Sequence, residues 1–455
     1  MIQRAERAAC SALRLRYRLV MALDDVLKQL ARAGAQTVYG KALAPNDNSK
    51  NQVYLGGSLA AVNLLPVREI IADAESPKRL KAPVSFSWLT PTGLDPAPHA
   101  QLILYPDYPE VRLSGFLRGC TRAPNTVMAS REPGRVLLIG VTAERTIVAI
   151  ALESEAAAAV EFIAKAATFK TWGVLAELPL PTSISLYDAS PLLRKLHGIH
   201  TKGWIRSWSL GPFGERNPCE SVQCGGYTLE AELGIAKNAR SEPDFLGWEI
   251  KSFKVKSTEA ALLKGNAITL MTPEPTGALY YDDFAQFWSR YSYPDKSKKE
   301  GLEGRRNFGG IYKCGARPNA TTDLTLTLGD YNAAKQTFNA GGALSLVDSS
   351  GRVAASWGFA GLLEKWSRKH ALAAFVPVEE HRDQPRRYRY DARVALARGT
   401  DFTRFLQAVS KGKVYLDPAV KFEDGKYKKR NQFRVAFKDL ASLYYDFREE
   451  RVIDP

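Results

Sequence analysis

Residues 230–253 of the chain read EAELGIAKNARSEPDFLGWEIKSF. The end of this stretch has the composition of a strand, and alternate side chains of a strand share a face. Glu249 and Lys251 are therefore expected to point the same way. Trp248 and Ile250 are expected to face the opposite, apolar side. The spacing predicts a strand that offers an acid and a lysine together.

Asp244 lies just upstream, in or before a turn over residues 245–247. A hairpin there would place its carboxylate next to Glu249. Two adjacent carboxylates repel each other unless a cation lies between them. Mg²⁺ takes oxygen ligands, and here it would have Asp244, Glu249 and the carbonyl of Ile250. Such an ion polarises a phosphate and lowers the pKa of an attacking water, which Lys251 would help to orient.

Glu230 lies on the preceding predicted helix, and its carboxylate could complete or tune this site. A surface strand with an ion pair between Glu249 and a nearby lysine is the alternative. A short acid, spacer, acid-x-lysine pattern occurs often by chance. The pattern alone leaves both interpretations open.

The chain has 455 residues and a formal net charge of +15. The length predicts two or three domains. A positive charge of this size favours a polyanionic partner, of which nucleic acid is the commonest, although a basic protein without such a partner is the alternative.

The five cysteines are odd in number and scattered, which argues against a disulfide framework. Cys219 and Cys224 lack a second pair at zinc-site spacing, so they are interpreted as ordinary thiols. A reducing, bacterial cytoplasm fits this usage best. We find no signal peptide and no membrane-spanning stretch, and expect no membrane partner.

Short apolar runs broken by Pro, Gly and Asn dominate from about residue 36 to residue 152, which predicts a compact, barrel-like β-rich domain. The proline-rich run at 178–183 marks a domain edge. After it, strands alternate with helices, which predicts a mixed α/β domain. We therefore expect a β-rich domain over 1–175, a linker over 176–190 and an α/β domain over 191–455.

The run GGYTLE at 225–230, then EPDF at 242–245 and GWEIK at 247–251, resembles the catalytic core of the MvaI/BcnI restriction endonucleases. These are relatives of the MutH nickase within the PD-(D/E)xK fold, a mixed sheet flanked by helices. The likeness continues through residues 272–275, 306–310 and 357–377.

This resemblance implies a monomeric, Mg²⁺-dependent type II enzyme that cuts double-stranded DNA within short CC-x-GG-like sites, with CCWGG favoured. Asp244 and Glu249 would be metal ligands, Lys251 the catalytic lysine and Glu230 the accessory acid. His370, at the end of a predicted helix over 357–370, is expected to cap or pack as a cation near the negative end of the helix dipole.

Two basic clusters in this half suggest DNA contacts, because arginine and lysine bind phosphates and arginine pairs with guanine. The alternative for each is a solvated basic strand. One cluster interleaves tyrosines and the other lies on a predicted hairpin of residues 414–422 and 432–437. The candidates are Arg386, Arg387 and Arg389 in the first cluster, and Lys421, Lys428, Lys429, Arg430 and Arg434 in the second.

The stretch 41–55 is polar and rich in asparagine; by itself it is best interpreted as a turn-rich loop. It is similar, however, to a loop of the EcoRII effector domain, a DNA-binding pseudobarrel that binds a second copy of the target site. A second arm would lie at 111–119. The implied architecture is type IIE, and the candidate DNA contacts are Lys41, Asn46, Lys50, Asn51, Gln52, Arg112 and Arg118.

Two other functions remain open at this stage. A MutH-like mismatch-repair nickase would leave nicked rather than linear plasmid. A non-cleaving DNA-binding regulator would bind without metal. The intact set of Asp244, Glu249 and Lys251 argues against the regulator.

Overall fold

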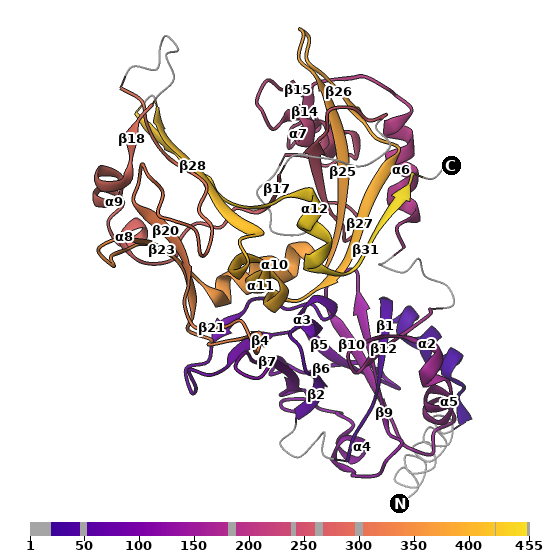
Figure 1. Cartoon of the computed structure of the whole chain (residues 1–455). Helices are drawn as coiled ribbons and strands as arrows, with labels where there is room; N and C mark the ends of the chain where they lie inside the picture. Colours follow the sequence, from indigo (N-terminus) through magenta and orange to yellow (C-terminus); the bar gives the residue numbers. More distant parts are fainter. Residues whose placement is uncertain are drawn as a thin grey trace, which may run out of the picture. The chain divides into compact units, whose positions relative to one another are not determined.

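The chain divides into two compact units, Met1–Asp188 and Ala189–Pro455, which Figure 1 colours from indigo to yellow along the sequence. The predicted linker over 176–190 begins too early, because β12 (Leu175–Leu178) belongs to a sheet of the first unit. The computed structural model describes residues 20–45, 52–180, 188–237, 243–259, 267–295, 304–423 and 425–452.

The first unit is rich in strands, as predicted. Its strands form two separate sheets. One sheet has seven strands, in the order β11 (Lys170–Trp172), β12, β1 (Ala35–Ala42), β9 (Val136–Thr142), β10 (Ile147–Leu152), β5 (Phe86–Thr90) and β6 (Gly93–Pro96). The other has five, in the order β2 (Gln52–Gly56), β8 (Glu110–Ser114), β7 (Gln101–Tyr105), β4 (Leu80–Pro83) and β3 (Ile71–Ala72).

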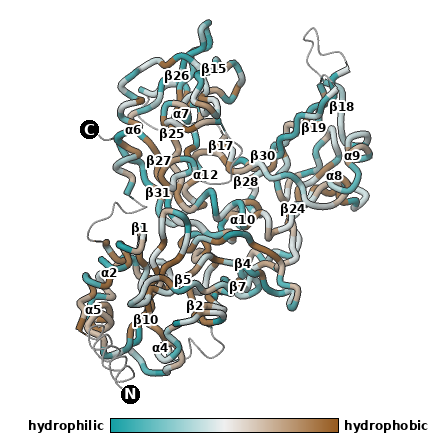
Figure 2. Tube along the Cα trace, turned by 180° about the vertical axis from the view of Figure 1, so that it is seen from behind, coloured by the Kyte–Doolittle hydropathy of each residue, from teal (hydrophilic) through white to brown (hydrophobic). Residues whose placement is uncertain are grey.

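Two helices pack together on the seven-stranded sheet, α2 (Leu23–Arg32) and α5 (Ala157–Lys165). Leu23, Val26, Leu27 and Leu30 repeat at helical spacing and bury one face of α2. They share a core with side chains of the inner strands, where the apolar residues concentrate (Figure 2). Burial of this apolar stripe accounts for helix α2.

The second unit is built around strand β25 (Leu372–His381). It pairs in parallel with β16 (Glu249–Lys254) and antiparallel with β26 (Arg387–Tyr390) and β27 (Arg393–Thr400). Two helices of this unit carry residues of the site, α7 (Cys224–Glu232) and α10 (Phe359–His370), whereas α6 (Ser190–His200) lies beside β26. The unit is thus mixed α/β, as predicted.

A second lobe combines the elements between β16 and α10 with strands from residues 414–435, which follow α10 in the chain (Figure 1). Its larger sheet runs β17 (Ile268–Met271), β30 (Asn431–Val435), β28 (Val414–Glu423), β19 (Arg306–Gly309) and β18 (Tyr293–Pro294), with β29 (Lys426–Lys428) beside β28. Its smaller sheet runs β20 (Leu324–Leu328), β23 (Ala343–Asp348) and β24 (Val353–Gly358), near α8 (Leu279–Asp282) and α9 (Phe284–Tyr291).

The predicted C-terminal hairpin is confirmed, because β28 and β30 pair antiparallel with Val414 opposite Val435. The remaining elements of the unit include β13 (Ile205–Arg206), α11 (Phe402–Ser410), α12 (Phe437–Leu440) and β31 (Tyr444–Arg451). None of the helices in the described residues is long and apolar enough to cross a membrane.

Candidate active site

A tight turn precedes β16. The Phe245 amide donates to the Trp248 carbonyl at 3.0 Å, and the Trp248 amide donates back to Phe245 at 2.8 Å. Leu246 has φ 47° and Gly247 has φ 84°, so both central residues are left-handed, as a two-residue hairpin turn requires. Glycine adopts this conformation without strain, which explains why it ends the turn.

Asp244 is held against β16 by this turn. Its Oδ2 accepts a hydrogen bond from the Ile250 amide at 2.8 Å, as the predicted hairpin required. Among the described strands, β16 pairs with β25 alone. The N–H and C=O of one strand residue point to the same edge. The Ile250 carbonyl therefore faces the side on which Asp244 lies.

Glu249 is the most enclosed acid of the site, with a side chain 4% exposed. Its Oε1 accepts from Lys251 Nζ at 3.0 Å, which confirms that these two side chains share a face. Lys369 Nζ lies 3.2 Å from Oε1 and 3.3 Å from Oε2 of the same carboxylate. Burial acts to raise the pKa of Glu249, but the two lysine charges outweigh it and hold this pKa below its usual value.

The pKa values of the other two acids of the site, Glu230 and Asp244, are raised. Burial, and then the negative charge of Asp244, raises the pKa of Glu230 to about 7. Burial and the charge of Glu249 likewise raise the pKa of Asp244. Glu230, on α7, therefore belongs electrostatically to the same cluster as Asp244 and Glu249. Excess negative charge in a partly buried site is what a cation relieves.

The oxygen donors of this site match the needs of Mg²⁺. Within the described ranges, no three His, Cys, Asp or Glu side chains form a ready-made metal cage. Mg²⁺ does not need one, because it keeps several waters and uses one or two carboxylates. Asp244, Glu249 and the outward Ile250 carbonyl supply that set, so the residues fit a hard divalent cation.

His370 ends α10 beside this cluster but is not part of the chemistry. It is fully buried, with Nδ1 2.6 Å from the Tyr444 hydroxyl and Nε2 3.1 Å from the Leu270 carbonyl. Burial lowers its pKa to about 3, with Lys251 adding to the effect. The expected packing role agrees with this position, whereas burial disfavours the expected cation at the helix end.

Comparison with known proteins places this site in a family. A sequence profile of the MvaI/BcnI restriction endonuclease family matches residues 193–444. The chain belongs to this family. It is therefore a site-specific deoxyribonuclease, and the matched residues include Glu230, Asp244, Glu249 and Lys251.

Two solved structures are similar to the chain. One, described as a complex of the restriction endonuclease MvaI with a cognate DNA substrate, aligns with 58% of this chain and 99% of its own, at 15% identity and TM-score 0.43. The other, MvaI in the absence of DNA, aligns with 60% of this chain and 100% of its own, at 14% identity and TM-score 0.30. No curated protein sequence gives a significant match. The assignment to the MvaI/BcnI family rests on the profile.

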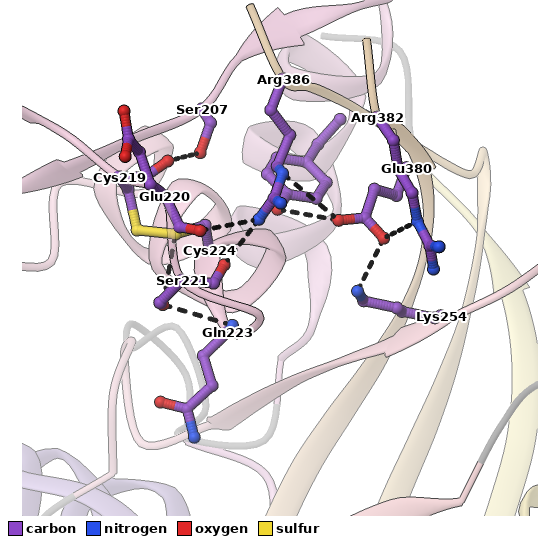
Figure 3. Close-up of polar contacts among 11 residues, drawn as sticks. Ser207, Cys219, Glu220, Ser221, Gln223, Cys224, Lys254, Glu380, Arg382 and Arg386 are labelled. Atoms are coloured by element: carbon purple, nitrogen blue, oxygen red, sulfur yellow. Dashed lines mark hydrogen bonds and ion pairs between the residues drawn. A yellow bond between two sulfur atoms is a disulfide. The ribbon is translucent and has the colours of Figure 1, made fainter. Parts of the chain in front are cut away.

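The first basic cluster is largely engaged within the protein. Arg386 donates to the carbonyls of Glu220 and Ser221, both at 3.0 Å, and lies 3.7 Å from Glu380 (Figure 3). Arg389 pairs with two further acids, Glu379 and Glu259, each at 3.0 Å. Arg387 makes no side-chain hydrogen bond or ion pair with the described residues. The interleaved tyrosines, Tyr388 and Tyr390, are buried.

Most side chains of the hairpin cluster are likewise engaged within the protein. Lys421 and Lys428 pair with Glu423 at 2.7 Å and 2.9 Å. Lys429 lies over the Phe284 ring, 3.5 Å from its centroid, and Arg434 pairs with Asp417 at 2.6 Å. The Arg430 side chain is exposed and has no partner in the described residues.

The N-terminal candidates have different fates. Lys41 is 5% exposed, and its Nζ donates to the Ala42 carbonyl at 3.1 Å. Its burial on β1 does not favour the predicted DNA contact, which stays a prediction. Arg112 bonds Gln52 at 3.1 Å and pairs with Glu110. Arg118 is exposed at a cavity of about 440 Å³. Asn46, Lys50 and Asn51 lie outside the described residues.

Cys219 and Cys224 are joined by a disulfide, so their interpretation as ordinary thiols is wrong (Figure 3). The turn before α7 folds back and brings the two Cα atoms to 5.7 Å. A spacing of five residues does not reveal such a turn. The bond closes the segment whose carbonyls Arg386 binds.

Lys369 is the residue of this site that the sequence did not assign. It lies within the 357–377 stretch quoted for the family resemblance, next to His370. That stretch could have pointed to it, but no local spacing relates it to Glu249, which is far away in the chain. Only the pairing of β16 with β25 brings the two together.

Proposed function

We propose that the protein is a Mg²⁺-dependent type IIE restriction endonuclease that cuts DNA within a CC-x-GG-like site, with CCWGG favoured. The observation that carries this is the convergence of Asp244, Glu249 and Lys251 at the free edge of β16, inside the region matched by the family profile. The protein acts as a monomer in the bacterial cytoplasm.

Asp244, Glu249 and the Ile250 carbonyl hold the metal in this proposal. When bound, Mg²⁺ polarises the scissile phosphate and lowers the pKa of the attacking water. Lys251, beside Glu249, orients the nucleophile and offsets the negative charge that develops on the phosphate. Glu230, with its pKa near 7, accepts or shares a proton at the edge of the site.

DNA is bound by the basic residues of the second unit. Arg430, which is exposed and has no partner among the described residues, is the first candidate for reading a base, because arginine pairs bidentately with guanine. Arg387 is a candidate for a phosphate contact. Arg386 and Arg389 of the first cluster would contact DNA only by exchanging their present partners for it. The same holds for the hairpin cations other than Arg430. That set comprises Lys421, Lys428, Lys429 and Arg434.

The N-terminal unit is the effector domain in this proposal and binds a second copy of the target site. Arg118 supports it best, because it is exposed on a cavity lined also by Gln101 and Ser114. Gln52 and Arg112 form a polar pair on the neighbouring strands β2 and β8. Glutamine and arginine side chains in such positions suit base edges and phosphates.

A plasmid assay tests the proposal. Supercoiled plasmids with no, one or two CCWGG sites are incubated with the protein, with and without Mg²⁺, and the ends are sequenced. We expect Mg²⁺-dependent linear product with one shared end sequence, formed faster from the two-site plasmid. Persistent nicked product would favour a mismatch-repair nickase, and equal rates on one-site and two-site plasmids would exclude the type IIE mode.

A further inference from the structure

We propose that Lys369 is a second active-site lysine, a positioning residue that keeps Glu249 correctly oriented while Lys251 turns to the DNA. This inference rests on the proposed active site. It concerns a residue that neither the acid-x-lysine motif nor its spacing includes.

Lys369 contacts both oxygens of Glu249, at 3.2 Å and 3.3 Å, whereas Lys251 contacts only Oε1, at 3.0 Å. The two ammonium groups therefore share one oxygen, and the second oxygen is bound by Lys369 alone among the described residues. If Lys251 leaves the carboxylate for a phosphate, Glu249 keeps a charged partner on each oxygen. No rearrangement of Lys369 is needed.

The helix end that carries Lys369 is rigidly anchored. The neighbouring His370 is fully buried and bound at both ring nitrogens. Trp366 stacks on that ring, with centroids 4.0 Å apart, and its indole donates to Thr400 at 3.1 Å. The helix leads directly into β25, in which Ala373 pairs with Glu249. These contacts hold the backbone of Lys369 in place relative to Glu249.

An ordinary ion pair does not account for two lysines. Glu249 is 4% exposed and is already paired with Lys251, so one unit of positive charge would neutralise it. A second ammonium group beside the first is repelled by it. The second ammonium group is balanced by the further negative charge of Asp244 and Glu230, because Lys369 acts to lower the pKa of both. Lys369 is also in the last turn of α10, where the helix dipole favours a cation.

The test compares Lys369→Met and Lys369→Arg in the full-length protein. The control is Lys365→Met, which removes the same charge from an exposed position one turn earlier on α10. Three quantities are measured: the single-turnover cleavage rate on cognate DNA, the affinity for that DNA without metal, and Mg²⁺ binding by calorimetry without DNA. Melting temperatures report whether each variant folds.

We expect Lys369→Met to lower the cleavage rate about 10- to 100-fold, the range typical of groups that orient metal ligands. DNA affinity and melting temperature should stay unchanged. Mg²⁺ affinity should not fall, because removing a positive charge does not weaken a cation site. Lys369→Arg should restore most of the rate, and Lys365→Met should match the unmodified protein.

A Lys369→Met enzyme with full activity would overturn the proposal. So would a loss of Mg²⁺ affinity in proportion to the loss of rate, since Lys369 would then only maintain the metal site. Parallel measurements on Asp244→Asn and Lys251→Met separate the two levels. If these cut normally, the proposed active site itself is wrong; if only Lys369→Met cuts normally, the role of Lys369 alone is wrong.

Discussion

The active-site cluster and the basic hairpin of the same unit use their charges in different ways. In the cluster, Glu249 and two lysines are enclosed and bound to one another, next to acids whose pKa values are raised. On the hairpin, most lysines and arginines are paired, and Arg430 is left exposed. A run of charged residues in a sequence therefore does not by itself indicate a site. The fold decides whether the charges are paired with one another, as on the hairpin, or crowd like charges together, as in the cluster.

The largest expected effect comes from breaking the cluster. Asp244→Asn and Lys251→Met should each lower the cleavage rate about 10³-fold or more, because each removes a preorganised charge at the reacting phosphate. Binding to cognate DNA should persist in gel-shift assays. Lys254→Met is the control, since Lys254 ends the same strand but pairs with Glu380 at 2.8 Å. Near-normal cutting by Asp244→Asn would refute the assigned centre.

The raised pKa of Glu230 gives the next effect. Its folded pKa is about 7 against an ordinary 4.5, so the unfolded chain loses the proton first as pH rises. Folding stability should therefore fall between about pH 4.5 and 7, by up to about 3 kcal/mol. Metal-free melting curves across this range measure it, and Glu230→Gln should flatten them. An unchanged pH dependence in that variant would place the shift elsewhere.

The hairpin offers a smaller effect with an internal comparison. Arg430→Ala should weaken binding to cognate DNA by about 1–3 kcal/mol and relax specificity at one base pair. Arg434→Ala should lower stability more than affinity, because Arg434 is bound to Asp417 and to the Ala267 carbonyl. Competition binding on a set of single-substituted duplexes distinguishes them. Equal losses of affinity would mean that present pairing does not predict DNA contact.

The smallest effect is expected in the N-terminal unit. Arg118→Ala should reduce the rate advantage of a two-site over a one-site plasmid several-fold, within the energy of one phosphate or base contact. The one-site rate should not change. Arg32→Ala, at an exposed position of α2, is the matched control. An undiminished two-site advantage would remove Arg118 from the effector surface.

The spacing of residues along the sequence was sufficient to predict part of this site. The turn before β16 and the shared face of Glu249 and Lys251 follow from backbone geometry within eight residues, 244–251, and both are found. The hairpin of β28 and β30 was predicted for the same reason. Contacts across short sequence distances depend on periodicity, which a single sequence displays.

Long-range neighbours could not be predicted in this way. Lys369 contacts Glu249 only because β25 pairs with β16, although many other elements separate these two strands in the sequence. Lys41 has the residue type of a DNA contact, yet the sheet of the first unit encloses it. The disulfide of Cys219 and Cys224 depends on a turn whose shape their spacing does not specify.

The long segment of the chain between β16 and α10 has a consequence for biosynthesis. A nascent chain that has emerged through β16 already carries Asp244, Glu249 and Lys251. It still lacks Lys369, the strand β25 that pairs with β16, and Tyr444, whose hydroxyl holds His370. The centre is therefore assembled only when nearly the whole chain has been made, so incomplete translation products carry the motif without the assembled site.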